Sequence, residues 1–185
     1  MWLPMYDFPE NRPIQVRKDV IDMDIFEFLF QNKIPYERYD HEAVFTCEQA
    51  DRLGLETSAA KTKNLFLRDR KGRRHFLVTV GDEKAVDIKG LEEALEVKGL
   101  SFASADRLLE YLGLTPGSVT ILSVLNDPSG RVEVIVDKDL WQCNAIQCHP
   151  LVNTSTLVIS MQDIERFLSL TGHTPKIMDV PGRAG

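Results

Sequence analysis

Two lysines and an asparagine directly precede an apolar, strand-like run. Lys61, Lys63 and Asn64 are followed by Leu65-Phe66-Leu67. Polar side chains against an apolar strand predict a pocket, and a lysine at the start of a strand can hold a cation beside an apolar wall without being buried alone. Surface lysines are far more common than site lysines. Lys61 and Lys63 project to the same side of an extended strand, so the pattern alone does not rank them.

A second polar segment follows late in the chain. His149 and Pro150 are succeeded by Asn153, Thr154 and Thr156. Histidine commonly serves in proton handling and recognition, so this segment is a candidate site, with a packed or exposed histidine as the alternative. The three other histidines lack such polar company, and we do not expect them to be ligands: His41, His75 and His173.

Cys148 beside His149 raises the question of a thiol nucleophile. Neighbouring residues of a strand point to opposite faces, so a role in the pocket wall is favoured over nucleophilic attack. The chain has no HExxH, no Cys/His quartet and no GxSxG motif, which argues against metal-dependent hydrolysis and a serine triad. Neither GxxxxGK[ST] nor GxGxxG occurs, so no phosphate loop is predicted.

Length and charge narrow the class of protein. A chain of 185 residues fits one domain with its own core. The net charge of −6 argues against a broad basic face for DNA, and positive charge concentrates between residues 61 and 74. No apolar run approaches the ~20 residues of a membrane helix, and the first residues do not resemble a secretory signal. We therefore expect a cytoplasmic protein without a membrane partner, its cysteines reduced.

Helix and strand patterns alternate along the chain and predict a mixed α/β domain. Asp87, Ser104 and Ser160 are predicted helix caps, and a hairpin is predicted on either side of residues 69–73. A second hairpin is predicted around residues 126–130. The predicted helices are 19–33, 46–53, 87–97, 104–112 and 160–171, and the predicted strands are 36–39, 65–68, 75–80, 119–125, 132–136 and 156–159.

Three segments together resemble a known family. They are Lys63-Asn64-Leu65-Phe66-Leu67, Gly113-Leu114-Thr115-Pro116-Gly117-Ser118-Val119-Thr120 and the run from His149-Pro150 to Thr156. In order and spacing the chain is similar to the YbaK and prolyl-tRNA synthetase-associated editing family, most of all to free-standing proteins that remove alanine from mischarged proline tRNA. The resemblance implies an N-terminal extension (1–19), an editing domain (20–175) and a C-terminal tail (176–185), of which residues 181–185 are expected to be loose.

The resemblance implies a single mixed α/β domain, with a curved, mostly antiparallel mixed sheet flanked by helices. It also implies hydrolysis of the aminoacyl ester without metal or cofactor, assisted by a ribose hydroxyl of the terminal adenosine. Lys63 falls on the family's essential lysine. Ile146 stands where relatives carry a glycine in a loop. The other residues expected to bind substrate or form the pocket wall are Asn64, His149, Phe45, Leu65, Cys148, Leu151, Asn153 and Thr154.

The expected partner is the acceptor end of proline tRNA, with prolyl-tRNA synthetase as a transient partner. The amino acid removed stays open, because cysteine or another small residue would suit the same fold. The alternative from a different functional class is a noncatalytic module that binds aminoacyl-tRNA or a synthetase, because a protein can keep the fold of a family without its activity.

Overall fold

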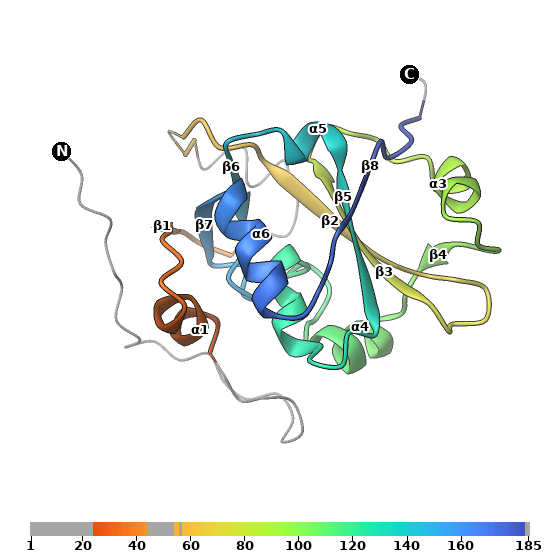
Figure 1. Cartoon of the computed structure of the whole chain (residues 1–185), viewed down its shortest axis with the longest axis horizontal. Coiled ribbons are helices and arrows are strands. Elements are labelled where there is room, and N and C mark those ends of the chain that lie inside the picture. Colours follow the sequence, from red (N-terminus) through yellow and green to blue (C-terminus); the bar gives the residue numbers. More distant parts are fainter. Residues whose placement is uncertain (1–23, 44–53, 56, 184–185) are drawn as a thin grey trace.

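Two β-sheets lie side by side in the computed structural model, which describes residues 24–43, 54–55 and 57–183 (Figure 1). The smaller sheet is antiparallel, in the order β1 (Glu37–Asp40), β7 (Ser155–Ser160), β6 (Ala145–Cys148). The larger is mixed, in the order β4 (Ser101–Phe102), β2 (Thr62–Arg68), β3 (His75–Gly81), β5 (Val132–Asp137), β8 (Lys176–Met178). The predicted mixed α/β class is confirmed, with two sheets in place of one.

Short helices surround these sheets, and the predicted caps are confirmed. Asp87 begins α3 (Ile88–Ala94), Ser104 begins α4 (Ala105–Leu112) and Ser160 begins α6 (Met161–Leu170), each accepting a backbone N–H hydrogen bond. The remaining α-helices of the described residues are α1 (Ile25–Gln31) and α5 (Lys138–Trp141). The predicted helix at 46–53 lies outside the described residues, as do residues 19–23 of the first one.

The β2–β3 hairpin is confirmed and sets the orientation of the lysine segment. Lys63 lies opposite Val80 and Asn64 opposite Thr79. Asp69 shapes the turn by accepting hydrogen bonds from the amides of Arg73 (2.7 Å) and Arg74 (3.2 Å). Side chains alternate between the faces of a strand, so Lys63 and Asn64 project to opposite sides of the larger sheet.

The second predicted hairpin is wrong. Residues 119–125 do not form a strand, and Ile121–Asn126 form the 3₁₀ helix η1. β5 instead pairs parallel to β3, with Val134 opposite Leu77. The run from Ile121 to Leu125 is buried throughout, and a short apolar run of this kind is compatible with either a strand or a buried helical turn.

The start of β2 joins the two sheets. Ala60 forms a parallel bridge with Ile146, and the Gln147 amide donates to the Ala60 carbonyl at 2.8 Å. The Thr62 hydroxyl then donates to the Gln147 carbonyl at 2.7 Å. Ile146, which stands where relatives carry a glycine in a loop, lies in β6 opposite Ile159 with its side chain fully buried. An extended backbone suits a β-branched residue, so glycine is not required there.

Apolar side chains fill both faces of the larger sheet. Phe66 and Leu77 contribute to the core shared with α6, whose Phe167 is fully buried. Leu67 and Phe76 contribute to a smaller core on the other face, with Leu91 of α3. The alternating pattern of β2 and β3 therefore fixes which polar residues of the same strands face each side.

The expected C-terminal tail is wrong for residues 176–183. β8 pairs with β5, with Ile177 opposite Val136. Val180 is fully buried and its amide donates to the Asp137 carboxylate at 3.1 Å. The Arg183 amide donates to the Ala85 carbonyl at 2.7 Å. Apolar residues within the segment bury against the smaller core, which holds it on the domain. No helix among the described residues has the length and apolarity needed to cross a membrane.

Candidate functional site

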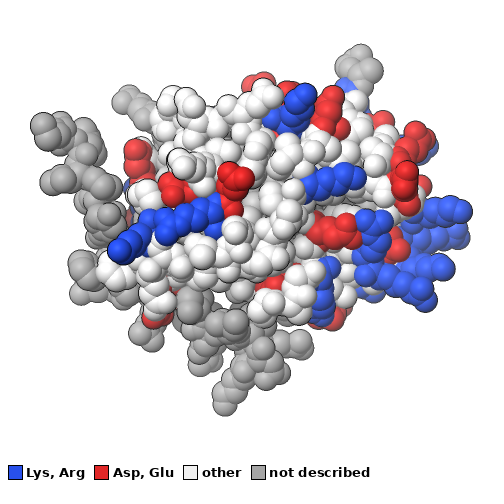
Figure 2. Space-filling model, viewed as in Figure 1, with Lys and Arg blue, Asp and Glu red and all other residues white. Residues whose placement is uncertain are grey.

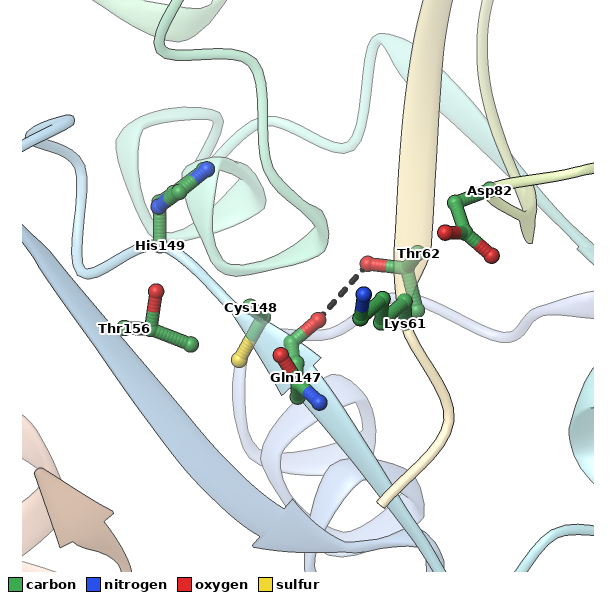
Figure 3. A pocket seen from close by; sticks show the side chains of 7 residues that line it. All are labelled: Lys61, Thr62, Asp82, Gln147, Cys148, His149 and Thr156. Atoms are coloured by element: carbon green, nitrogen blue, oxygen red, sulfur yellow. Dashed lines mark hydrogen bonds between the residues drawn. The ribbon is translucent and has the colours of Figure 1, made fainter. Parts of the chain in front are cut away.

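A small pocket opens where β2 meets β6 (Figure 3). Its volume is about 40 Å³. Residues from two sheets and the turn after β3 line it: Lys61, Thr62, Asp82, Gln147, Cys148, His149 and Thr156. Two of these lining residues, Thr62 and Gln147, are joined by a hydrogen bond, so the pocket lies at the junction that holds the two sheets together (Figure 3).

The predicted site residues fall in three places. Cys148 and His149 line the pocket. Phe45 lies outside the described residues. The others lie in the adjoining strands and loops without lining the pocket: Lys63, Asn64, Leu65, Leu151, Asn153 and Thr154. Their roles stay predictions.

Lys63 is held beside the pocket through the turn that follows β3. Its ammonium donates to the backbone carbonyl of Asp82 at 2.6 Å, and Asp82 lines the pocket. An ammonium has three N–H donors, so one bond to a carbonyl leaves donor capacity. Lys61 lines the pocket itself. The segment therefore supplies two cations at this edge of the sheet, one in the wall and one bonded to a wall residue.

Asn64 lies on the opposite face of β2 from Lys63. Its side-chain oxygen accepts a hydrogen bond from the Thr79 hydroxyl at 2.7 Å, and Thr79 is fully buried. This bond satisfies a buried hydroxyl, which is costly to leave unpaired. Asn64 and Lys63 are thus adjacent in sequence but separated by the strand, and Thr62 shares the face of Asn64.

One ring nitrogen of His149 is available to accept a proton or a hydrogen bond. Its Nδ1 lies 3.1 Å from the Ser155 carbonyl, which only accepts, so Nδ1 carries the hydrogen and a neutral ring keeps a lone pair on Nε2. Burial lowers the pKa of His149, the neighbouring His41 lowers it further, and the bond to Ser155 opposes the shift. The ring is therefore neutral at neutral pH and can accept a proton or a hydrogen bond.

His41 has polar company, contrary to expectation, and lies beside the pocket without lining it. Its Nε2 lies 2.9 Å from the hydroxyl of Thr156, and its ring centroid is 6.5 Å from that of His149. Its Nδ1 bonds the Glu42 carbonyl at 2.8 Å, so a neutral His41 accepts the Thr156 hydrogen at Nε2. The pairing of β1 with β7 brings these residues together across 115 positions of sequence.

Other wall residues were missed by the sequence reasoning. Gln147 donates from its side chain to the Ala59 carbonyl at 3.1 Å, and Asp82 donates its amide to the Lys61 carbonyl at 3.2 Å. The Gln147 contact depends on pairing between distant segments that no local pattern shows, whereas the Asp82 contact continues the register of the β2–β3 hairpin. Lys61 and Thr156 could have been predicted more easily as wall residues, because each lies within a polar segment that the sequence already indicated.

Cys148 is unsuited to nucleophilic attack. It is buried, and burial raises the pKa of its thiol to about 12, so the thiol stays protonated at neutral pH. This supports the predicted role in the pocket wall.

Replacing Cys148 with alanine should therefore preserve catalysis. We expect turnover of the best substrate within about threefold of the unchanged protein, whereas losing a nucleophile would abolish it. The wider pocket should also admit larger ligands. Single-turnover kinetics on several substrates measure both effects, and complete loss of turnover with an intact fold would contradict the assignment.

The described part of the chain contains no group of three or more His, Cys, Asp or Glu side chains placed to hold a metal ion. His75 and His173 have other surroundings. His75 is buried and stacks on Tyr111, with ring centroids 3.8 Å apart. His173 is buried with its Nε2 3.4 Å from the Asp127 carboxylate.

The fold and the pocket define a mixed α/β domain with a small polar site built from lysine and histidine at the junction of two sheets. The chain belongs to the aminoacyl-tRNA editing domain family, whose profile matches residues 41–167. The predicted family is thereby confirmed.

Relatives and solved structures agree with this placement. The chain is 38% identical over 164 residues to the prolyl-tRNA editing protein ProX of Acetoanaerobium sticklandii, covering 86% of this chain and 100% of the relative. It is 35% identical to the prolyl-tRNA synthetase associated domain-containing protein 1 of Danio rerio, covering 90% and 88%. A crystal structure provisionally assigned as a trans-editing enzyme for prolyl-tRNA synthetase superposes with a TM-score of 0.61 at 17% identity, over 80% of this chain and 87% of the other.

Proposed function

We propose that this protein is a trans-editing aminoacyl-tRNA deacylase that hydrolyses the ester of mischarged proline tRNA, with alanine as the amino acid removed. Membership of the editing family and the similarity to ProX support the reaction class. The observation that carries the proposal is a small pocket lined by Lys61 and a neutral His149, with Lys63 bonded to the wall residue Asp82. A cation and a proton acceptor at one pocket suit ester hydrolysis.

Pocket size supports alanine over proline. The pocket is small, at about 40 Å³, and the ring of proline adds carbons to the α-carbon, methyl and amino groups of alanine. Binding alone discriminates one methylene by only ~1–3 kcal/mol, so a second, hydrolytic selection by size is useful to the synthetase reaction.

In the proposed mechanism, water attacks the carbonyl carbon of the ester and negative charge develops on the carbonyl oxygen. Lys63 stabilises this charge, assisted by the positive field of Lys61. The bond between the carbonyl carbon and the ribose oxygen then breaks, and the ribose oxygen takes up a proton. A ribose hydroxyl of the terminal adenosine activates the water, and His149 orients the amino group through Nε2. Neither step uses Cys148.

Deacylation of a panel of proline tRNAs tests this proposal. The tRNA is charged separately with alanine, cysteine, serine and proline, and release of amino acid is measured under single-turnover conditions. We expect the alanyl form to be hydrolysed fastest and the prolyl form to survive. Faster release of cysteine would reassign the substrate within the same class. Binding without turnover at excess protein would replace the enzyme by a noncatalytic binding module.

The similarity to a prolyl-tRNA synthetase associated domain-containing protein supports that synthetase as a transient partner. Transient association would let this protein receive the mischarged tRNA before the synthetase releases that tRNA into solution. Addition of the synthetase to the panel should then raise the rate of alanine release at low tRNA concentration.

A further inference from the structure

The tip of the β2–β3 hairpin concentrates positive charge in an acidic protein. Arg70, Lys71 and Arg73 are exposed there, and we call these three residues the basic tip. Figure 2 shows Lys and Arg gathered at the end of the molecule where Figure 1 draws this hairpin. The whole chain carries a net charge of −6, so this local excess of positive charge runs against the overall balance.

Nearby acids do not neutralise the basic tip. The Asp69 carboxylate accepts from the amides of Arg73 and Arg74. Glu133 binds the Arg74 side chain through two bonds of 2.7 Å. Among the described residues, no ion pair joins an acid to Arg70, Lys71 or Arg73. Their charge is therefore available to a partner.

The tip is held in one conformation by contacts from its surroundings. The Arg70 amide donates to the Lys98 carbonyl at 2.7 Å. The Arg107 guanidinium of α4 donates to the Gly72 carbonyl at 3.3 Å, and Gly72 adopts a positive φ of 62°. A preformed arrangement of cations loses less entropy when it binds a partner than a mobile one.

The distance from the pocket suits an extended nucleic acid. β2 runs directly from the pocket residue Thr62 to Arg68 at the base of the tip. Six residue steps of a strand span about 20 Å at ~3.3 Å each. A stacked nucleic acid strand advances ~3.4 Å per nucleotide, so the tip lies about six nucleotides from a terminal adenosine in the pocket.

We propose that the basic tip binds phosphates of the acceptor stem of the tRNA whose aminoacyl end occupies the pocket. This inference rests on the proposed function and names the surface that holds the body of the substrate. The contact is with phosphate and not with bases, so it positions the tRNA without reading its sequence. It gives a protein of net negative charge a local site for RNA.

A pair of charge-matched variants tests the proposal. Lys71→Ala with Arg73→Ala removes two charges from the tip, and Arg166→Ala with Lys176→Ala removes two exposed charges from α6 and β8. The tip variant should raise KM for alanyl-tRNA roughly three- to tenfold with kcat unchanged, at about 1 kcal/mol or less for each exposed contact. The slope of log kcat/KM against log salt should fall by about 2. The control variant should change neither.

Two further measurements separate this proposal from the proposed function. An alanylated oligonucleotide that carries only the unpaired 3′ end should be hydrolysed equally by the tip variant and the unchanged protein. Binding of uncharged proline tRNA, followed by fluorescence anisotropy, should weaken in the tip variant whether or not the protein is a hydrolase. Equal tRNA affinity and equal salt slope in the tip and control variants would overturn the tip proposal. Failure of the unchanged protein to hydrolyse either substrate would overturn the proposed function alone.

Discussion

Replacing Lys63 with alanine should lower kcat/KM for alanyl-tRNA by about 10²–10³-fold, the usual cost of removing one preorganised donor that stabilises a developing oxyanion. The Lys63 ammonium is held at 2.6 Å by the carbonyl of Asp82, which lines the pocket, so its position is fixed before substrate arrives. A cation fixed in advance needs no reorganisation as charge develops. The loss should therefore fall mainly on kcat.

Lys61→Ala is the matched control, because both lysines lie at the same edge of the sheet and only Lys61 lines the pocket. We expect less than about tenfold loss from Lys61→Ala, mainly in KM, since a partly exposed charge contributes up to ~1 kcal/mol to binding a phosphate. Thermal unfolding of both variants separates catalysis from stability. A larger catalytic loss from Lys61→Ala than from Lys63→Ala would move the central role to Lys61.

Replacing His149 with alanine should lower the rate by about 10–10²-fold, because the lost hydrogen bond to the amino group of the substrate contributes ~1.5–3 kcal/mol. The neutral ring offers Nε2 to the substrate, because Nδ1 is bound to the Ser155 carbonyl. Protonation would remove that lone pair. Activity should therefore fall as the pH drops through the pKa of His149.

The pH profile of kcat/KM gives a sharper test than the rate alone. Burial lowers the pKa of His149 below the ordinary value of 6.5, so the acidic limb should lie below pH 6.5. His149→Gln should remove this limb, and His41→Gln should move it upward by removing a neighbour that disfavours the second positive charge. If the acidic limb persists in His149→Gln, it arises from the titration of another group.

The same shift affects stability in a defined direction. Between the folded and unfolded pKa values of His149, the unfolded chain binds a proton that the folded chain does not, so stability falls with falling pH in that window. Activity should thus be compared only where unfolding curves show a fully folded protein.

Local patterns predicted the elements that carry Lys63. Alternation and turn residues identified the β2–β3 hairpin, and the caps at Asp87, Ser104 and Ser160 begin the predicted helices. These signals arise between residues close in sequence, where propensity, capping and turn geometry act directly. The resemblance carried by the two polar segments led to the correct family.

The predictions from sequence failed where a strand pairs with a segment that is distant in the chain. Residues 119–125 have the composition of a strand, but Ile121–Asn126 form η1, and β5, the predicted hairpin partner, instead pairs parallel to β3. The strand β6 and the residues after Asp179 were likewise missed as parts of the fold. The apolar composition of a segment indicates that it is buried, whereas the strand with which it pairs depends on the packing of the whole core.

The sequence by itself determined the family, the hairpin that presents Lys61 and Lys63, and the polar character of the segment at His149. Only the tertiary structure decided that Lys61 enters the pocket wall while Lys63 bonds the Asp82 carbonyl, and that His41 joins Thr156 beside His149. The physical reason is that side-chain periodicity fixes the face of a strand, but the meeting of β2 with β6 and of β1 with β7 fixes what that face encounters.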